Sequence, residues 1–92
     1  MSQRGSRMAS FENTINEIGN DQNRLYRERE RLMRAYEQRR SELQTYENNL
    51  GFLSAKSKNG DTMLRDMQRR MQRIKDDIAD LEKKIKVIDS KL

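Results

Sequence analysis

Apolar residues recur at alternating spacings of three and four along the last third of the chain. An alternating three-four spacing averages about 3.5 residues, which on an α-helix draws one continuous apolar stripe that another helix must cover. The pattern therefore predicts a long helix that pairs with a second helix. The members of this stripe are Leu64, Met67, Met71, Ile74, Ile78, Leu81, Ile85, Ile88 and Leu92.

A second apolar stripe lies upstream on a single heptad frame. Its members are Phe11, Ile15, Ile18, Leu25, Leu32, Tyr36, Leu43, Tyr46 and Leu50, with Gln22, Arg29 and Arg39 as polar exceptions. The frame passes Gly19 and Asn20 without a phase shift, so we expect only a bend or fraying there, although glycine weakens a helix by about 1 kcal/mol relative to alanine. An arginine on the stripe can lay its methylenes on the partner helix and reach solvent, or it can set register or contact a partner.

Capping and turn residues predict where these elements begin and end. Ser10 is a good N-cap, Gly51 can end a helix in the left-handed conformation, and Asn59-Gly60 followed by Asp61 predicts a turn and a new cap. We therefore expect an all-α, antiparallel two-helix coiled-coil hairpin that is able to self-associate. Its parts are a flexible N-terminus over residues 1–9, a helix over 10–50, a loop over 51–60 and a helix over 61–92.

The two stripes also predict a register. Pairing positions whose numbers sum to 110 sets an a position opposite a d position in every layer, as for Leu32 with Ile78. Exposed charge pairs contribute little stability but help to select between arrangements. The pairs expected in this register are Glu42 with Arg70, Glu28 with Lys84, and Asp21 with Lys91. Tyr26 and Met33 would flank the seam as an exposed strip for docking or self-association.

Composition narrows the functional class. The 92 residues are 33% hydrophobic and 38% charged, which suits long helices with one buried stripe better than a globular core. Neither cysteine nor histidine occurs, so the sequence lacks thiolate nucleophiles, imidazole bases and the commonest transition-metal ligands. Apolar runs are far shorter than the roughly 20 residues that cross a bilayer. We expect a cytoplasmic, non-enzymatic protein with no cofactor, no metal, no membrane partner and no small-molecule substrate.

Positive charge concentrates toward the hairpin tip. Residues 31–75 hold 11 Lys/Arg against 5 Asp/Glu, and the predicted register brings Arg39 and Arg40 beside Arg69, Arg70 and Arg73. A solvated helix surface is the ordinary interpretation of such charges, whereas the bias toward arginine favours contacts with phosphate. The candidate phosphate or nucleic-acid contacts are Arg39, Arg40, Lys56, Lys58, Arg65, Arg69, Arg70 and Arg73.

Four short segments of the sequence resemble a known family. Residues 46–53 (YENNLGFL), 54–60 (SAKSKNG), 64–67 (LRDM) and 85–89 (IKVID) resemble the C-terminal end of bacterial proteins of the domain of unknown function 349 family. The resemblance covers about residues 30–92. It implies a helical, charged, cytoplasmic protein, and it transfers no catalytic or binding residues. Family members are usually longer, with tandem helical units, so the chain corresponds either to a part of such a protein or to a short relative.

Two functions remain open at this stage. The first is a coiled-coil interaction or assembly module that docks on a larger protein partner or on itself through the helix seam. The alternative is a nucleic-acid or ribonucleoprotein binder, for example a ribosome-associated one, that uses the arginine-rich tip.

Overall fold

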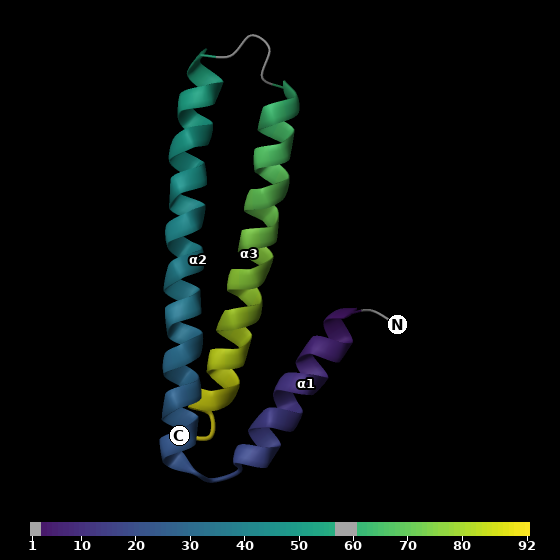
Figure 1. Ribbon diagram of the computed structural model, residues 1–92, viewed down its shortest axis with the longest axis vertical. Helices are drawn as coiled ribbons and strands as arrows, with labels where there is room; N and C mark the ends of the chain where they lie inside the picture. Colours follow the sequence, from purple (N-terminus) through teal and green to yellow (C-terminus); the bar gives the residue numbers. More distant parts are fainter. Residues whose placement is uncertain (1–2, 57–60) are drawn as a thin grey trace.

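The protein is a helical hairpin with a third helix folded against its base. The computed structural model describes the backbone of residues 3–56 and 61–92, and the side chains of residues 9–51 and 62–92. Within the described backbone it consists of α1 (Gln3–Ile18), α2 (Gln22–Lys56) and α3 (Asp61–Asp89), and contains no strand. Helices α2 and α3 run antiparallel side by side (Figure 1). The predicted all-α helical hairpin is confirmed.

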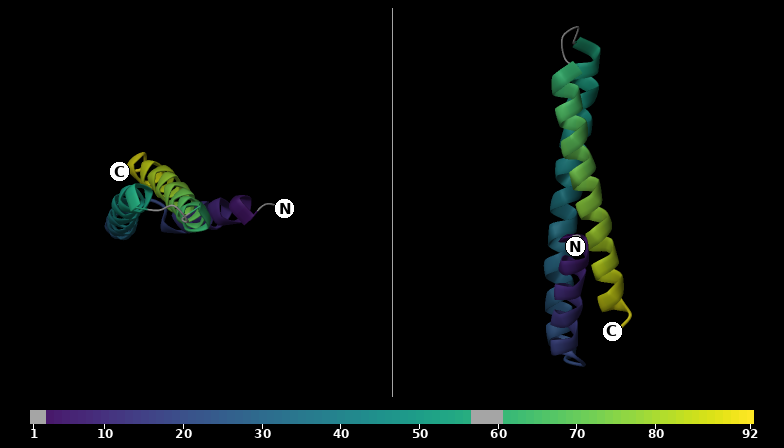
Figure 2. Two further views of the ribbon diagram at one scale, coloured as in Figure 1. Left: turned by 90° about the horizontal axis from the view of Figure 1, so that it is seen from above. Right: turned by 90° about the vertical axis from the view of Figure 1, so that its right-hand side faces the viewer.

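The molecule is a flat rod, as Figure 2 shows from two further sides. Its principal extents are 56, 30 and 14 Å. The smallest extent is close to the 10–12 Å diameter of one helix with its side chains, so the long pair forms a single layer. None of the helices in the described ranges has the length and apolarity that a membrane crossing needs.

The chain reverses direction at Gly19, where the sequence predicted one helix over residues 10–50. That prediction was wrong. Gly19 adopts a φ of +60°, in the left-handed region that glycine reaches without a Cβ clash. Two residues later, the carboxylate of Asp21 accepts a hydrogen bond from the Arg24 N–H at 3.3 Å and caps α2. A heptad frame records the spacing of side chains but not the direction of the backbone, so it could not reveal this turn.

Helix α1 also begins earlier than expected. It starts at Gln3, and Ser10 lies inside it, where the Ser10 carbonyl accepts a hydrogen bond from the Thr14 hydroxyl at 3.0 Å. The predicted N-cap at Ser10 was therefore wrong, because the residues before Ser10 can continue the helix. From its start, α1 runs antiparallel to α2 and approaches the hairpin toward its C-terminal end (Figure 1).

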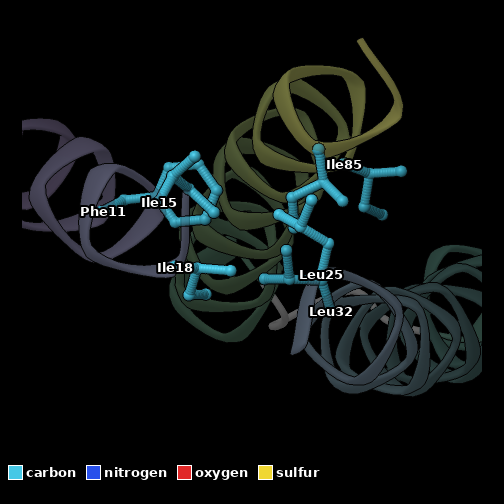
Figure 3. Packing of buried hydrophobic residues seen from close by; sticks show 7 residues of the cluster. Phe11, Ile15, Ile18, Leu25, Leu32 and Ile85 are labelled. Atoms are coloured by element: carbon cyan, nitrogen blue, oxygen red, sulfur yellow. The ribbon is translucent and has the colours of Figure 1, made fainter. Parts of the chain in front are cut away.

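A three-helix core closes the base of the hairpin. Ile15 and Leu25 are 1% and 0% exposed, and Figure 3 shows the apolar side chains of α1 pointing toward those of α2 and α3. Burial of each large aliphatic side chain contributes about 1.5–3 kcal/mol, so α1 adds stability that a two-helix hairpin lacks. The core consists of Phe11, Ile15, Ile18, Leu25, Leu32, Ile85 and Ile88, with Met33, Tyr36, Leu81 and Val87 packed against it.

Helix α2 runs past the glycine that was expected to end it. Gly51 lies inside α2, and a Cβ there would have nothing within 4 Å. Residues 51–56 are helical, so the predicted loop over 51–60 begins too early. The rest of that loop, including the Asn59-Gly60 turn, lies outside the described residues. Gly51 therefore takes a helical position in place of the left-handed one that would end α2.

Helix α2 continues further than predicted before the chain turns back, so the pairing of α2 with α3 is shifted by about one heptad. Tyr36 donates a hydrogen bond to Glu82 at 3.3 Å, whereas the predicted register placed Tyr36 opposite Ile74. A shift of ~7 residues leaves a positions opposite d positions and keeps the same apolar stripes in the seam. The hydrophobic pattern therefore cannot distinguish the two registers, and the position of the turn decides between them.

The interhelical charge pairs predicted from that register were wrong as well. Glu28 pairs with Arg31, Glu42 with Arg39, and Lys84 with Asp80, each within its own helix. Asp21 is engaged as the cap of α2. Residues three or four apart are neighbours on a helix surface, so these local partners are always within reach.

Candidate functional site

Exposed arginines form a line along the first half of α3. Arg65, Arg69 and Arg73 follow one another at four-residue intervals, which places them on one face of the helix about 6 Å apart along its axis. Arg70 stands next to this line. All four side chains are exposed, and none of them makes a salt bridge or hydrogen bond with another residue in the described part of the chain. We call these four residues the arginine face.

Few acidic residues offset this charge. Residues 62–75 contain five basic residues and a single acid, Asp66. Arginine is charged at every physiological pH, and its planar fork matches carboxylate and phosphate groups. The arginine face is therefore a permanent site of positive charge that can bind an anionic partner.

Arg39 and Arg40 do not join the arginine face, contrary to the predicted convergence. Arg39 lies 2.8 Å from Glu42 and 3.5 Å from Asp77. This placement follows from the register shift, which moves α2 toward the acidic second half of α3. Lys56 and Lys58 were also predicted contacts, but the side chain of Lys56 and all of Lys58 lie outside the described residues.

Arg40 belongs to a polar chain with Tyr36. It donates a hydrogen bond to the Tyr36 hydroxyl at 3.1 Å, and its guanidinium carbon lies 5.7 Å from the centre of the Tyr36 ring. The hydrogen bond with Tyr36, reinforced by the charge of Glu82, raises the pKa of Arg40 above its ordinary value. The contact that crosses from this polar chain to α3 is the hydrogen bond that Tyr36 donates to Glu82.

One member of the arginine face, Arg70, borders a part of the seam that is incompletely covered, whereas Arg65, Arg69 and Arg73 lie on the outer side of α3. Arg70 follows Met67 by three residues and precedes Ile74 by four, so it neighbours both on the helix surface. Ile74 is buried, but Met67 is only half-buried. The half-buried seam residues of this tip half are Leu43, Tyr46, Leu50, Leu64 and Met67. Since α1 covers the base alone, a partner can bury further apolar surface here.

The remaining seam residues follow their predicted positions, apart from those at the ends of the helices. Met71, Ile74, Ile85 and Ile88 are buried, and Ile78 and Leu81 are half-buried. Leu92 lies beyond the end of α3 and is 41% exposed. Ile18 packs into the base core from α1 rather than from a continuous first helix.

Two arginines on the stripe of α2 form salt bridges across the hairpin. The Nε atom of Arg29 lies 2.6 Å from the Asp89 carboxylate, and Arg39 reaches Asp77. Of the two interpretations of the stripe arginines, this geometry favours a role in register, because each arginine meets an acid on the opposite helix. The acidic residues Asp77 and Asp89, which lie beside the second stripe, are the sequence feature that could have predicted these salt bridges.

The predicted exposed strip of Tyr26 and Met33 is present only in part. Tyr26 is 59% exposed, but Met33 packs against the base core. The two-helix interpretation left Met33 in solvent, whereas in the three-helix base it packs against the core. A single exposed tyrosine is too small an apolar area to mark an interface.

Comparisons with known proteins give no relative of this chain. No protein-family model matches it, no curated protein matches it, and no solved structure matches it. In the described ranges, no three acidic side chains converge as a metal site. The resemblance of residues 30–92 to the domain of unknown function 349 family therefore stays a prediction, and the arrangement of the arginine face and the half-covered seam is what bears on function.

Proposed function

We propose that this protein is a non-enzymatic helical interaction module that docks an acidic protein partner along the tip half of its hairpin. Two observations carry the proposal: the arginine face is unpaired within the described chain, and one of its members, Arg70, flanks the half-covered seam. An acidic amphipathic helix fits both features. Its apolar stripe would cover Leu64 and Met67 while its flanking carboxylates meet Arg70, and the other three arginines add long-range attraction for an acidic partner.

The base of the molecule supports this role by fixing the geometry of the tip. The three-helix core holds α2 and α3 together at one end of the rod, and the Arg29–Asp89 pair matches this register. The arginine face lies toward the opposite end, where α3 begins (Figure 1). An arm with its contact surface far from its base suits a module that bridges two larger components.

The proposal includes a cytoplasmic setting and the family resemblance of residues 30–92. The absence of cysteine supports the cytoplasmic setting, because small secreted domains commonly depend on disulfides. The long helices and high charge agree with what the family resemblance implies.

A nucleic-acid or ribonucleoprotein partner is the second candidate, and it rests on the same arginines. Guanidinium groups bind phosphate oxygens in pairs of parallel hydrogen bonds, and a line of three along one helix could follow a phosphate backbone. A phosphate backbone would leave Leu64 and Met67 uncovered. This difference favours the protein partner.

Capture from native lysate distinguishes these candidates when it is done with two matched variants. The test variant replaces Arg69, Arg70 and Arg73 with glutamine, which keeps most of the helix propensity. The control variant replaces Lys83, Lys86 and Lys91, so that the same charge is lost near the base. We expect nuclease-resistant capture of acidic proteins that the test variant loses and the control variant keeps.

Two other outcomes of this capture experiment would argue against an acidic protein partner. Capture that disappears with nuclease would favour the nucleic-acid partner. Equal capture by the parent and both variants would show that the arginine face is ordinary solvated surface.

A further inference from the structure

The turn between α1 and α2 is short and depends on one glycine. Only Gly19, Asn20 and Asp21 separate the two helices, and the chain reverses within them. Gly19 is the sole residue of the described chain with a positive φ. A return of these residues to helical φ and ψ would join α1 and α2 into one straight helix.

The straight helix would carry one stripe in a single heptad phase, with Gln22 as a polar position at the junction. Ile18 and Leu25 are seven residues apart, so the stripe of α1 continues into that of α2 on the same heptad frame. A turn that served only to reverse the chain would not have to keep the stripes of α1 and α2 on the same heptad frame. The sequence is therefore compatible with both a folded-back α1 and a straight one.

Straightening within a single copy would uncover the base core. Phe11, Ile15 and Ile18 would leave the hairpin, and Leu25 and Ile88 would lose their cover. The exposed stripe of α1 would then need a surface complementary to it. The surface already shown to fit is the base of this same chain.

We infer that two copies of the protein exchange α1 and form a domain-swapped dimer. In the monomer, α1 runs antiparallel to α2 (Figure 1). With a twofold axis near the straightened turns, the α2 helix of the second copy runs antiparallel to the straight helix of the first. Each α1 then meets the base of the other copy in the same relative direction that it has in the monomer.

The contacts that hold α1 in the monomer are the contacts that would hold the dimer. Phe11, Ile15 and Ile18 pack into the same core, and the Lys84 ammonium, 5.6 Å from the centre of the Phe11 ring, keeps its aromatic partner. The two states differ mainly at the three turn residues. Short turns of this kind allow exchange, because straightening gives up the Asp21 cap but keeps the contacts of the base core.

Two single substitutions shift this equilibrium in opposite directions. Gly19→Ala disfavours the left-handed turn, which costs an ordinary residue roughly tenfold in population, and two turns straighten in each dimer. The dimer dissociation constant should therefore fall by roughly a hundredfold. Gln22→Pro does the reverse, because the first residue of α2 tolerates proline, whereas in a straight helix the ring would clash with the Ile18 carbonyl.

Sedimentation over a range of concentrations, with circular dichroism to confirm helicity, measures the outcome. We expect Gly19→Ala to be mainly dimeric at concentrations where Gln22→Pro stays monomeric, with the parent between them. A Gly19→Ala chain that remains monomeric, or a Gln22→Pro chain that dimerises as well as the parent, would overturn the proposal.

A crosslink between copies tests the exchange itself. One chain carries Gly19→Ala with Phe11→Cys, the other carries Gly19→Ala with Lys84→Cys, and the two are mixed with a short bifunctional maleimide. Exchange predicts heterodimeric crosslinks. Dimers that form without any crosslink between these positions would contradict the swap and indicate another interface.

Discussion

Arg29 on α2 and Asp89 at the end of α3 form a salt bridge of 2.6 Å across sixty positions of sequence. This pair shows that the register of the hairpin differs from the predicted one, which placed Arg29 opposite Leu81. Its two side chains are 39% and 46% exposed, so solvent and salt screen the interaction. The pair therefore identifies the arrangement more than it stabilises it.

A double-mutant cycle on Arg29→Gln and Asp89→Asn should give a small coupling energy. We expect about 0.2–1 kcal/mol at low ionic strength, the range of exposed pairs, and less in 1 M salt. Urea unfolding of the four proteins measures this value. A coupling well above this range, or one unaffected by salt, would mean that the pair is far more buried than the structure has it.

Crosslinking within a monomer should distinguish the observed register from the predicted one. Cysteines at Arg39 and Asp77 replace two side chains that touch, so a short bifunctional maleimide should join them. Cysteines at Arg39 and Arg70 serve as the control, since the predicted register would bring that pair close. The account requires fast intramolecular joining for the first pair and slow joining for the second. The reverse order would restore the predicted register.

Stability should differ between the base and the tip of the hairpin. Ile15→Ala opens a cavity in the three-helix core and should cost about 2–5 kcal/mol, the range for fully buried aliphatic residues. Leu43→Ala in the tip half should cost clearly less, because Leu43 is only half-buried. Thermal melts of the two variants at one concentration make the comparison. Equal losses would show that α1 does not close the base.

The stripes were predictable because burial of a helix face needs only side-chain periodicity, as the buried Leu32 and Ile85 illustrate. The turn at Gly19 and the continuation past Gly51 were not, since both glycines fit a helix or a turn equally well from sequence. One of them reverses the chain and the other does not. The arginine face followed from sequence, whereas the separation of Arg39 from it depended on a register that the stripes cannot specify.

Salt dependence should separate an electrostatic surface from a specific one. If the arginine face binds single-stranded RNA, the logarithm of the affinity should fall with the logarithm of salt by about 0.7 for each phosphate neutralised. Replacing Arg69, Arg70 and Arg73 with glutamine should then flatten this slope. An unchanged slope in that variant would place any RNA contact elsewhere on the chain.

Docking of an acidic amphipathic partner on the tip half can be measured by a peptide titration. The probe is a fluorescent peptide of ~21 residues, three heptads with leucine at a and d and glutamate at the flanks. A labelled RNA of mixed sequence is titrated in parallel. We expect the parent and the control variant at Lys83, Lys86 and Lys91 to bind the peptide with equal affinity, and both to bind it more tightly than RNA. Replacing Arg69, Arg70 and Arg73 with glutamine should weaken peptide binding at least tenfold, which is about 1.4 kcal/mol. Tighter binding of RNA than of the peptide, or peptide binding that the arginine substitutions leave unchanged, would contradict this docking.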